Sequence, residues 1–226
     1  MSVDKGNWYF QKTRGEMVEF LPKDYSTVLE IGCGEGNFAS HLRAGSEIWG
    51  IEPSSSSSVI ASEKMHRVLV GKWEEVADEL ADNYFDLVIC NDVIEHMPNH
   101  DEFFLSIRDK IKSQGYLIGS VPNVRYYKHL YELLIQKDWR YRDYGILDNT
   151  HLRFFSEKSL RRTLINHGFI IEELTGINLP NYYQNKNFSI QNFVKTISLK
   201  AVEALTLGFY SDISFLQLGF RVRKEN

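Results

Sequence analysis

The sequence predicts an α/β fold built on a parallel sheet. Apolar runs of strand length alternate along the chain with stretches of helical character. A strand followed by a helix and another strand favours parallel pairing with right-handed crossovers. The stretch Thr27–Ala39, TVLEIGCGEGNFA, adds a third observation, because an apolar run passes through three glycines into an expected helix. Such a turn is typical of sites that bind nucleotide-like ligands.

Each expected strand is a short apolar run bounded by polar or glycine residues. These runs are Thr27–Ile31, Glu47–Ile51, Arg67–Val70, Phe85–Cys90, Gly115–Val121 and Phe169–Leu174, with a looser alternation at Ile213–Val222. Each expected helix has apolar side chains at helical spacing or a capping residue at one end. The expected helices are Asn37–Arg43 before Gly45, Val59–Met65 after the N-capping serine run Ser54–Ser58, Trp73–Ala81, Glu102–Lys112, and Ser159–His167 before Gly168.

Two later segments break this alternation. Residues 123–155 are rich in Tyr, Arg and Asp, and we expect them to form a substrate insertion. Residues 178–210 combine a loop with an expected helix at Ile190–Leu207, which predicts a helical insertion, a lid or a contact in a homodimer. We expect the whole chain, 1–226, to form a single domain with these two insertions.

Composition narrows the class of protein. The chain has 226 residues, 43% of them hydrophobic, which is enough for one sizeable core. A formal net charge of -4 argues against a nucleic-acid partner, since phosphate-binding surfaces normally make a domain basic. Two cysteines form no disulfide framework and fit a reducing compartment. No signal-peptide pattern and no apolar run of about 18 residues is present, so we expect a cytoplasmic protein without a membrane span.

The residues around the glycine turn indicate which ligand it holds. Glu52 ends the second expected strand, where a carboxylate can accept hydrogen bonds from ribose hydroxyls. The third glycine comes one residue earlier than in the dinucleotide fingerprint, and Asn37 stands in its place. Glu30, just before the first glycine, disfavours a pyrophosphate and suits an ammonium or sulfonium charge. S-adenosylmethionine carries both of these charges.

The stretches VLEIGCGEG, FDLVICNDVIEHM and GYLIGSVPN, together with Glu52, resemble class I S-adenosylmethionine-dependent methyltransferases. The resemblance extends in order over Val28–Leu174. It implies a Rossmann-like, seven-stranded, mostly parallel sheet with helices on both faces and an antiparallel last strand beside the fifth. It also implies S-adenosyl-L-methionine as cofactor, with S-adenosyl-L-homocysteine as product.

The resemblance further implies cofactor contacts at the carboxyl ends of the strands. The implied residues are Glu30, Gly32, Cys33 and Gly34 at the methionine end, Glu52 at the ribose, Trp73 and Glu74 at the adenine, and Asn91 and Asp92 near the sulfonium. Lys72 departs from the pattern, because family members often carry an acidic residue there. The adenine contacts are therefore expected to differ from those of the family.

Two histidines are candidates for a general base, which assists methyl transfer to a hydroxyl. His96 follows the fourth expected strand and serves either as base or substrate contact, or as a loop histidine bonded to the backbone. His151 lies three residues after Asp148, so the two form either a carboxylate–imidazole pair or a loop anchor. His96, Asp92 and His100 are close in sequence but lack a recognised metal-ligand spacing, so no metal site is expected.

The nature of the acceptor rests on a closer resemblance. VPNVRYYKHLYELL and DWRYRDYGILDNTHLRFFSEKSLRRTL are similar to methyltransferases associated with bacterial polysaccharide and glycan biosynthesis. This implies O-methylation of a sugar or glycan precursor as a small-molecule acceptor. Two alternatives stay open: an N-, C- or quinone-type small-molecule methyltransferase, and a cofactor-binding module without turnover.

Overall fold

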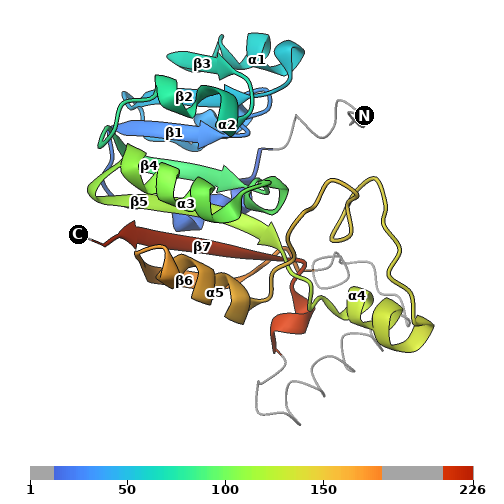
Figure 1. Ribbon diagram of the computed structural model, residues 1–226. Coiled ribbons are helices and arrows are strands. Elements are labelled where there is room, and N and C mark those ends of the chain that lie inside the picture. The colour runs from blue at the N-terminus through green and yellow to red at the C-terminus, as the bar shows by residue number, and fades with distance from the viewer. Residues whose placement is uncertain (1–12, 180–210, 226) are drawn as a thin grey trace, which may run out of the picture.

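The computed structural model describes residues 13–179 and 211–225. In these residues seven strands form one sheet, in the order β3-β2-β1-β4-β5-β7-β6 (Figure 1). The strands are β1 (Thr27–Ile31), β2 (Glu47–Glu52), β3 (Arg67–Val70), β4 (Phe85–Asn91), β5 (Ile111–Pro122), β6 (Phe169–Ile177) and β7 (Gln217–Lys224). The pairs among β1 to β5 are parallel, and β7 runs antiparallel between β5 and β6. The predicted Rossmann-like fold is confirmed, including the antiparallel last strand beside the fifth.

Both faces of the sheet are covered, which explains why its central strands read as continuous apolar runs. The α-helices are α1 (Ser55–Ala61), α2 (Trp73–Val76), α3 (His100–Lys110), α4 (Tyr127–Tyr131) and α5 (Glu157–Asn166). One face packs against α2, α3 and α5 through side chains such as Phe104 and Leu164. The other packs against α1 and two 3-10 helices, Gly15–Phe20 and Asn37–His41.

Some boundaries differ from the prediction for local reasons. The serine run forms α1 itself instead of only preceding a helix, and Ser54 caps it by accepting from the Ser57 N–H at 3.4 Å. The Ser58 hydroxyl donates to the Ser55 carbonyl at 2.9 Å, so a hydroxyl buried in this helix is satisfied by the helix backbone. The helix expected after the glycine turn is a 3-10 helix, preceded by Gly36 in a left-handed conformation with φ +71°.

The topology places a ligand site at the carboxyl ends of β1, β2 and β4. β1 has β2 on one side and β4 on the other, so the strand order reverses at this point. Crevices at such switch points are where open α/β sheets bind ligands. Glu30 is paired in register with Gly50 of β2 and with Ile89 of β4, so the residues that end these strands emerge together.

The two predicted insertions differ in how much of each the structure describes. Residues 123–155 connect β5 to α5 and contain α4 and a short π-helix, Glu132–Gln136. Their role in binding substrate stays a prediction. Most of 178–210, including the helix expected at Ile190–Leu207, lies outside the described residues. Within the described ranges, no helix is both long and apolar enough to cross a membrane.

Candidate active site

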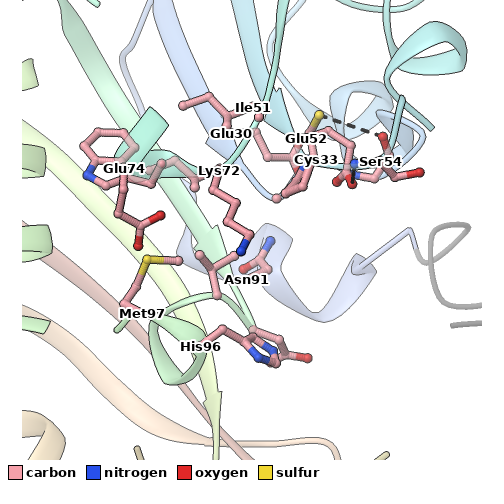
Figure 2. Close-up of a pocket in the computed structure, with 18 of the residues that line it drawn as sticks. Glu30, Cys33, Ile51, Glu52, Ser54, Lys72, Glu74, Asn91, His96 and Met97 are labelled. Carbon is pink, nitrogen blue, oxygen red and sulfur yellow. Dashed lines mark hydrogen bonds between the residues drawn. The ribbon is translucent and has the colours of Figure 1, made fainter. Parts of the chain in front are cut away.

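A pocket of about 650 Å³ opens at the carboxyl ends of β1, β2 and β4 (Figure 2). Every predicted cofactor residue lines it, and so does His96. In the view of Figure 2, Glu30 and Glu52 lie at the upper end of the pocket, and His96 and Met97 lie at the lower end. The lining comprises Arg14, Glu30, Ile31, Gly32, Cys33, Gly34, Ile51, Glu52, Pro53, Ser54, Gly71, Lys72, Trp73, Glu74, Asn91, Asp92, Val93, His96, Met97, Pro98, Thr150 and Leu152.

The glycine turn is held in shape by the end of β2. The N–H groups of Gly32 and Cys33 both donate to the Ile51 carbonyl, at 2.8 and 3.1 Å. Gly32 has φ +70°, and a Cβ added there would lie 2.8 Å from Cγ2 of Val93. Glycine is therefore required at this position, both for its backbone conformation and for the space it leaves.

Glu52 ties the turn to the start of α1 and lies in the pocket wall. Its Oε2 accepts from the Gly34 N–H at 2.9 Å and its Oε1 from the Ser54 N–H at 2.8 Å. Burial raises the pKa of this carboxyl, and the two N–H groups partly offset that effect. Each carboxylate oxygen can accept a further bond, so the residue is suited to the ribose hydroxyls of a nucleoside.

Glu30 is a buried acid facing the same pocket. Burial raises its pKa to about 8, the Arg14 guanidinium opposes that rise, and Glu52 adds to it. Its Oε2 has no hydrogen-bond partner among residues 13–179 and 211–225. Buried polar atoms in proteins are normally bonded, so an unmatched carboxyl oxygen at a pocket wall fits a ligand that brings a donor. An amino-acid ammonium group is such a donor.

Asn91 and Asp92 end β4 and differ in their surroundings. Both polar atoms of the Asn91 side chain are buried and lack a partner in the described part of the chain. Asp92, with φ +54°, accepts from the Ser120 hydroxyl at 2.9 Å and from the Gln217 amide. Asn91 therefore fits a ligand contact, whereas Asp92 also organises the edge of the sheet; that both lie near the sulfonium stays a prediction.

Arg14, which is not among the predicted site residues, reaches the pocket from the segment before β1. Its guanidinium donates to the Asp92 carboxylate and lies 3.5 Å from Glu16. Arg14 and Glu30 thus bring a cation and an acid to one end of the pocket, where a ligand with both a carboxylate and an ammonium group is matched. No local signal marked Arg14, because it is far in sequence from the glycine turn.

The predicted adenine region contains one core residue and two exposed ones. Trp73 is buried and packs edge-on against Phe103, with ring centroids 5.6 Å apart. The side chains of Lys72 and Glu74 line the pocket from the start of α2 (Figure 2). The Lys72 N–H donates to Glu75 at 2.8 Å, which fixes this turn. A lysine at this position supplies a donor where an acidic side chain would supply an acceptor.

Two histidines meet at the other end of the pocket. The rings of His96 and His151 are 4.7 Å apart between centroids. Nδ1 of His96 lies 3.1 Å from the Thr150 carbonyl, and Nδ1 of His151 lies 2.9 Å from the Ile146 carbonyl. Since a carbonyl only accepts, Nδ1 of each imidazole is a donor in these contacts. His96 lines the pocket, and the buried His151 lies behind it.

Glu95 is a carboxylate that faces His151, and the bonds of Asp148 match the loop anchor, one of the two readings predicted for it. Glu95 Oε1 lies 3.9 Å from Nε2 of His151. Asp148 is buried, and its Oδ1 accepts from the Thr150 N–H at 2.9 Å and from the Thr150 hydroxyl at 2.6 Å. This Asp-x-Thr turn is a common local use of aspartate, and it turns the carboxylate back onto its own loop. Asp148 does not line the pocket.

Comparisons with known proteins identify the family of this chain. The family described as "Methyltransferase domain" matches residues 8–174. Ubiquinone biosynthesis O-methyltransferases from Rickettsia bellii and Rickettsia canadensis are 30% and 29% identical over 159 residues. These alignments cover 66% of this chain and 64% and 65% of the relatives, so the chain spans less than two thirds of their length.

Solved structures show the same fold. An S-adenosylmethionine-dependent methyltransferase from Archaeoglobus fulgidus has a TM-score of 0.66 at 20% identity, over 96% of this chain and 93% of that one. One from Aquifex aeolicus has a TM-score of 0.58 at 15% identity, over 97% of this chain and 94% of that one. Together with the family match over most of the chain and the fit of the pocket to the ligand's charges, this shows that the chain belongs to the S-adenosylmethionine-dependent methyltransferases.

Proposed function

We propose that this protein transfers a methyl group from S-adenosylmethionine to a hydroxyl oxygen on the ring of a quinone-type precursor. The observation that carries the proposal is the position of His96 at the end of the pocket opposite Glu30 and Glu52 (Figure 2). Met97 lies at that end beside His96 (Figure 2), and Pro98 and Leu152 add apolar side chains to the pocket lining, which suits a flat aromatic ring. The relatives named for ubiquinone biosynthesis support the same class of acceptor.

The cofactor supplies a methyl group on a positively charged sulfur, a leaving group that needs no further activation. Arg14 and Glu30 would hold its amino-acid end, and Glu52 its ribose. The protein orients the acceptor in line with the methyl carbon and excludes water. Nε2 of His96 accepts the hydroxyl proton as the new carbon–oxygen bond forms and the carbon–sulfur bond breaks. The Thr150 carbonyl accepts from Nδ1–H, which fixes the orientation of the His96 ring.

A sugar or glycan precursor is the second candidate acceptor. The resemblance of the stretches around 121–134 and 138–164 to glycan-associated methyltransferases favours it. Tyr141 and Tyr144 are exposed beside this region, and aromatic faces can stack on sugars. The relatives named above do not support this acceptor, and the apolar wall near His96 fits it less well. N- or C-methylation and cofactor binding without turnover remain the further alternatives.

A panel of acceptors tests the proposal. Purified protein and labelled S-adenosylmethionine would be incubated separately with dihydroxybenzoate-type phenols, nucleotide sugars and amines, and labelled product would be identified by mass spectrometry. We expect O-methylated phenol, and a loss of about 10²-fold or more in kcat for His96→Gln. The exposed His41→Gln is the matched control. Methylated sugar alone would overturn the ring acceptor, methylated amine alone would overturn O-transfer, and label in no product would favour the binding module.

Two other expectations belong to this proposal. A cytoplasmic location is supported by Cys33 and Cys90, which are both buried free thiols. A homodimer through 190–209 rests on the sequence of that segment alone, and light scattering of the full chain at working concentration measures it directly.

A further inference from the structure

We propose that Gln217 is a positioning residue for methyl transfer, acting through Asp92 to hold the Arg14 guanidinium against the carboxylate of the bound cofactor. Gln217 is the first residue of β7, and it is buried, with 8% of its surface exposed. It does not line the pocket itself, so its effect on a ligand has to pass through residues that do. The inference rests on the part of the proposed function that assigns Arg14 to the amino-acid end of the cofactor.

Five side chains from four parts of the chain form a closed ring of polar contacts. The Arg14 guanidinium donates to Oδ2 of Asp92, and its Nη1 lies 3.5 Å from Oε1 of Glu16. Gln217 contacts the same aspartate, because its Nε2 donates to Oδ1 of Asp92. Nδ2 of Asn178 closes the ring by donating to Oε1 of Gln217 and, at 3.3 Å, to Oε1 of Glu16. The same two carboxylates are therefore linked twice, once by the guanidinium and once by the two amides.

The two carboxylates determine which way each amide in the ring points. An ionised carboxylate only accepts hydrogen bonds, so Gln217 turns its NH₂ group to Asp92, and Asn178 turns its NH₂ group to the other carboxylate. The carbonyl oxygen of Gln217 then faces the NH₂ group of Asn178, which carries one hydrogen for each of its two acceptors. Each contact of the ring thus joins a donor to an acceptor. A residue without an amide at position 217 would break two of these contacts.

Gln217 helps to set the rotation of the Asp92 carboxylate. Oδ1 of Asp92 accepts from the Gln217 amide and, at 2.9 Å, from the Ser120 hydroxyl. Two donors on this oxygen turn the other oxygen, Oδ2, toward the Arg14 guanidinium, where it accepts a charge-assisted hydrogen bond. Without the Gln217 amide, Oδ1 would lose one of these two donors. The carboxylate would then hold the guanidinium less firmly.

The same strand also supports the segment that carries Arg14. β7 runs antiparallel to β5 (Figure 1), so its first residue lies at the edge of the sheet where the pocket opens. Gln217 and Gly219 are two residues apart and therefore share one face of β7. Phe20 packs on that face, since a Cβ added to Gly219 would lie 2.6 Å from its ring. Phe20 ends the 3-10 helix that begins directly after Arg14, so β7 fixes both ends of this segment.

Three members of the ring have left-handed backbone conformations. The φ angle is +52° at Arg14, +54° at Asp92 and +58° at Asn178. Residues other than glycine seldom adopt this conformation, and it persists where surrounding contacts impose it, most often at functional sites. The ring supplies such contacts, so the guanidinium is in place before the ligand arrives. A group that is already in place binds more tightly, because less conformational freedom is lost on binding.

Two ligands that differ by the amino-acid group test this inference without any acceptor. Calorimetry of the full-length protein would measure the affinity for S-adenosylhomocysteine and for methylthioadenosine, which keeps the adenine, ribose and sulfur but lacks the amino-acid group. We expect Gln217→Leu to weaken S-adenosylhomocysteine binding at least tenfold. Asn178→Gly, which permits the left-handed backbone, should weaken it at least threefold. Methylthioadenosine affinity should stay within twofold in both variants, and the exposed Gln136→Leu, the matched control, should bind both ligands as wild type does.

A double variant measures whether Gln217 acts through Arg14. Arg14→Leu should weaken S-adenosylhomocysteine binding at least tenfold and spare methylthioadenosine. Adding Gln217→Leu to Arg14→Leu should then weaken S-adenosylhomocysteine binding by less than a further twofold, since residues that act as a unit are not additive. A further tenfold loss in the double variant would overturn the inference. Unchanged S-adenosylhomocysteine affinity in Gln217→Leu, or equal losses for the two ligands in both Gln217→Leu and Asn178→Gly, would also overturn it.

The outcomes separate this inference from the proposed function. If Arg14→Leu binds both ligands as wild type does, the assignment of Arg14 to the amino-acid end fails, and the inference fails with it. A selective loss in Arg14→Leu without one in Gln217→Leu overturns the inference alone. The acceptor panel is a separate measurement, so a failure of the ring acceptor would leave the result for Gln217 unchanged.

Discussion

Replacing Glu30 by Gln should change how cofactor affinity depends on pH. Glu30 is buried, and burial raises its pKa to about 8 despite the nearby Arg14 guanidinium. At pH 7 most of these carboxyls are therefore protonated before a ligand arrives. An ammonium group binds the ionised form, so binding at pH 7 must also remove a proton, which costs about 1.4 kcal/mol, and about twice that at pH 6.

The expected affinity for S-adenosylhomocysteine follows from this cost. It should tighten about tenfold between pH 6 and pH 7 and then level off near pH 8, with close to one proton released per ligand at pH 7. Calorimetry in two buffers of different ionisation enthalpy measures both quantities. In the Glu30→Gln variant the side chain at position 30 cannot ionise, so the affinity for S-adenosylhomocysteine should lose this dependence on pH. Equal slopes for wild type and Glu30→Gln would refute the assignment of Glu30 to the ammonium group.

Three further predictions concern other parts of the fold. Asp86→Asn should lower the free energy of unfolding at pH 7 by about 2–3 kcal/mol in urea titrations, because its carboxylate accepts from a lysine ammonium and from backbone and hydroxyl groups at the start of β1. Partial burial acts to raise the pKa of Asp86, but these bonds together hold the pKa well below its usual range. The stabilisation by Asp86 is therefore fully present above about pH 4 and is lost as the pH falls through the depressed pKa. The exposed Asp24→Asn should change little at any pH. Burial lowers the pKa of His100 to about 4, with help from a nearby arginine and histidine, so unfolding becomes easier as the pH falls from about 6.5 to 4. His100→Phe should remove about 2 kcal/mol of that loss at pH 5, and an unchanged pH profile would contradict the assignment. Gly32→Ala should abolish S-adenosylhomocysteine binding, because the new Cβ would lie 2.8 Å from Val93 in a backbone conformation that alanine disfavours; binding within a few fold of wild type would contradict it.

The parts of the fold that depend on local sequence could be predicted. The strand Thr27–Ile31 matches the structure residue for residue, because a strand in the interior of a parallel sheet reads as a bounded apolar run. The edge strand Arg67–Val70 also matches, because polar residues and Gly71 bound its short apolar run. The glycine turn, Glu30 and Glu52 are also local, since each follows directly from the end of a strand. The pocket confirms that these residues lie together.

The rest of the site depends on contacts between distant parts of the chain. Arg14 reaches the pocket only because the segment before β1 returns to the end of β4 and meets Asp92. His151 meets Glu95 across two loops, whereas spacing along the chain offered Asp148 either as its partner or as a loop anchor. A separation of three residues fits a side-chain pair and an Asp-x-Thr turn equally well, so the sequence could not distinguish them.

The glycine turn and Glu52 form the centre of this account, and calorimetric titration with S-adenosylhomocysteine tests them most directly, with NAD as the competing ligand. Wild type should bind S-adenosylhomocysteine at micromolar affinity and should not bind NAD. Glu52→Gln should weaken binding at least tenfold, because it replaces one carboxylate oxygen by an NH₂ group, which cannot accept from a ribose hydroxyl or from the Gly34 or Ser54 N–H. Glu35→Gln should bind as wild type does. Binding of NAD alone, or S-adenosylhomocysteine binding that is unchanged in Glu52→Gln, would contradict the assignment of this pocket.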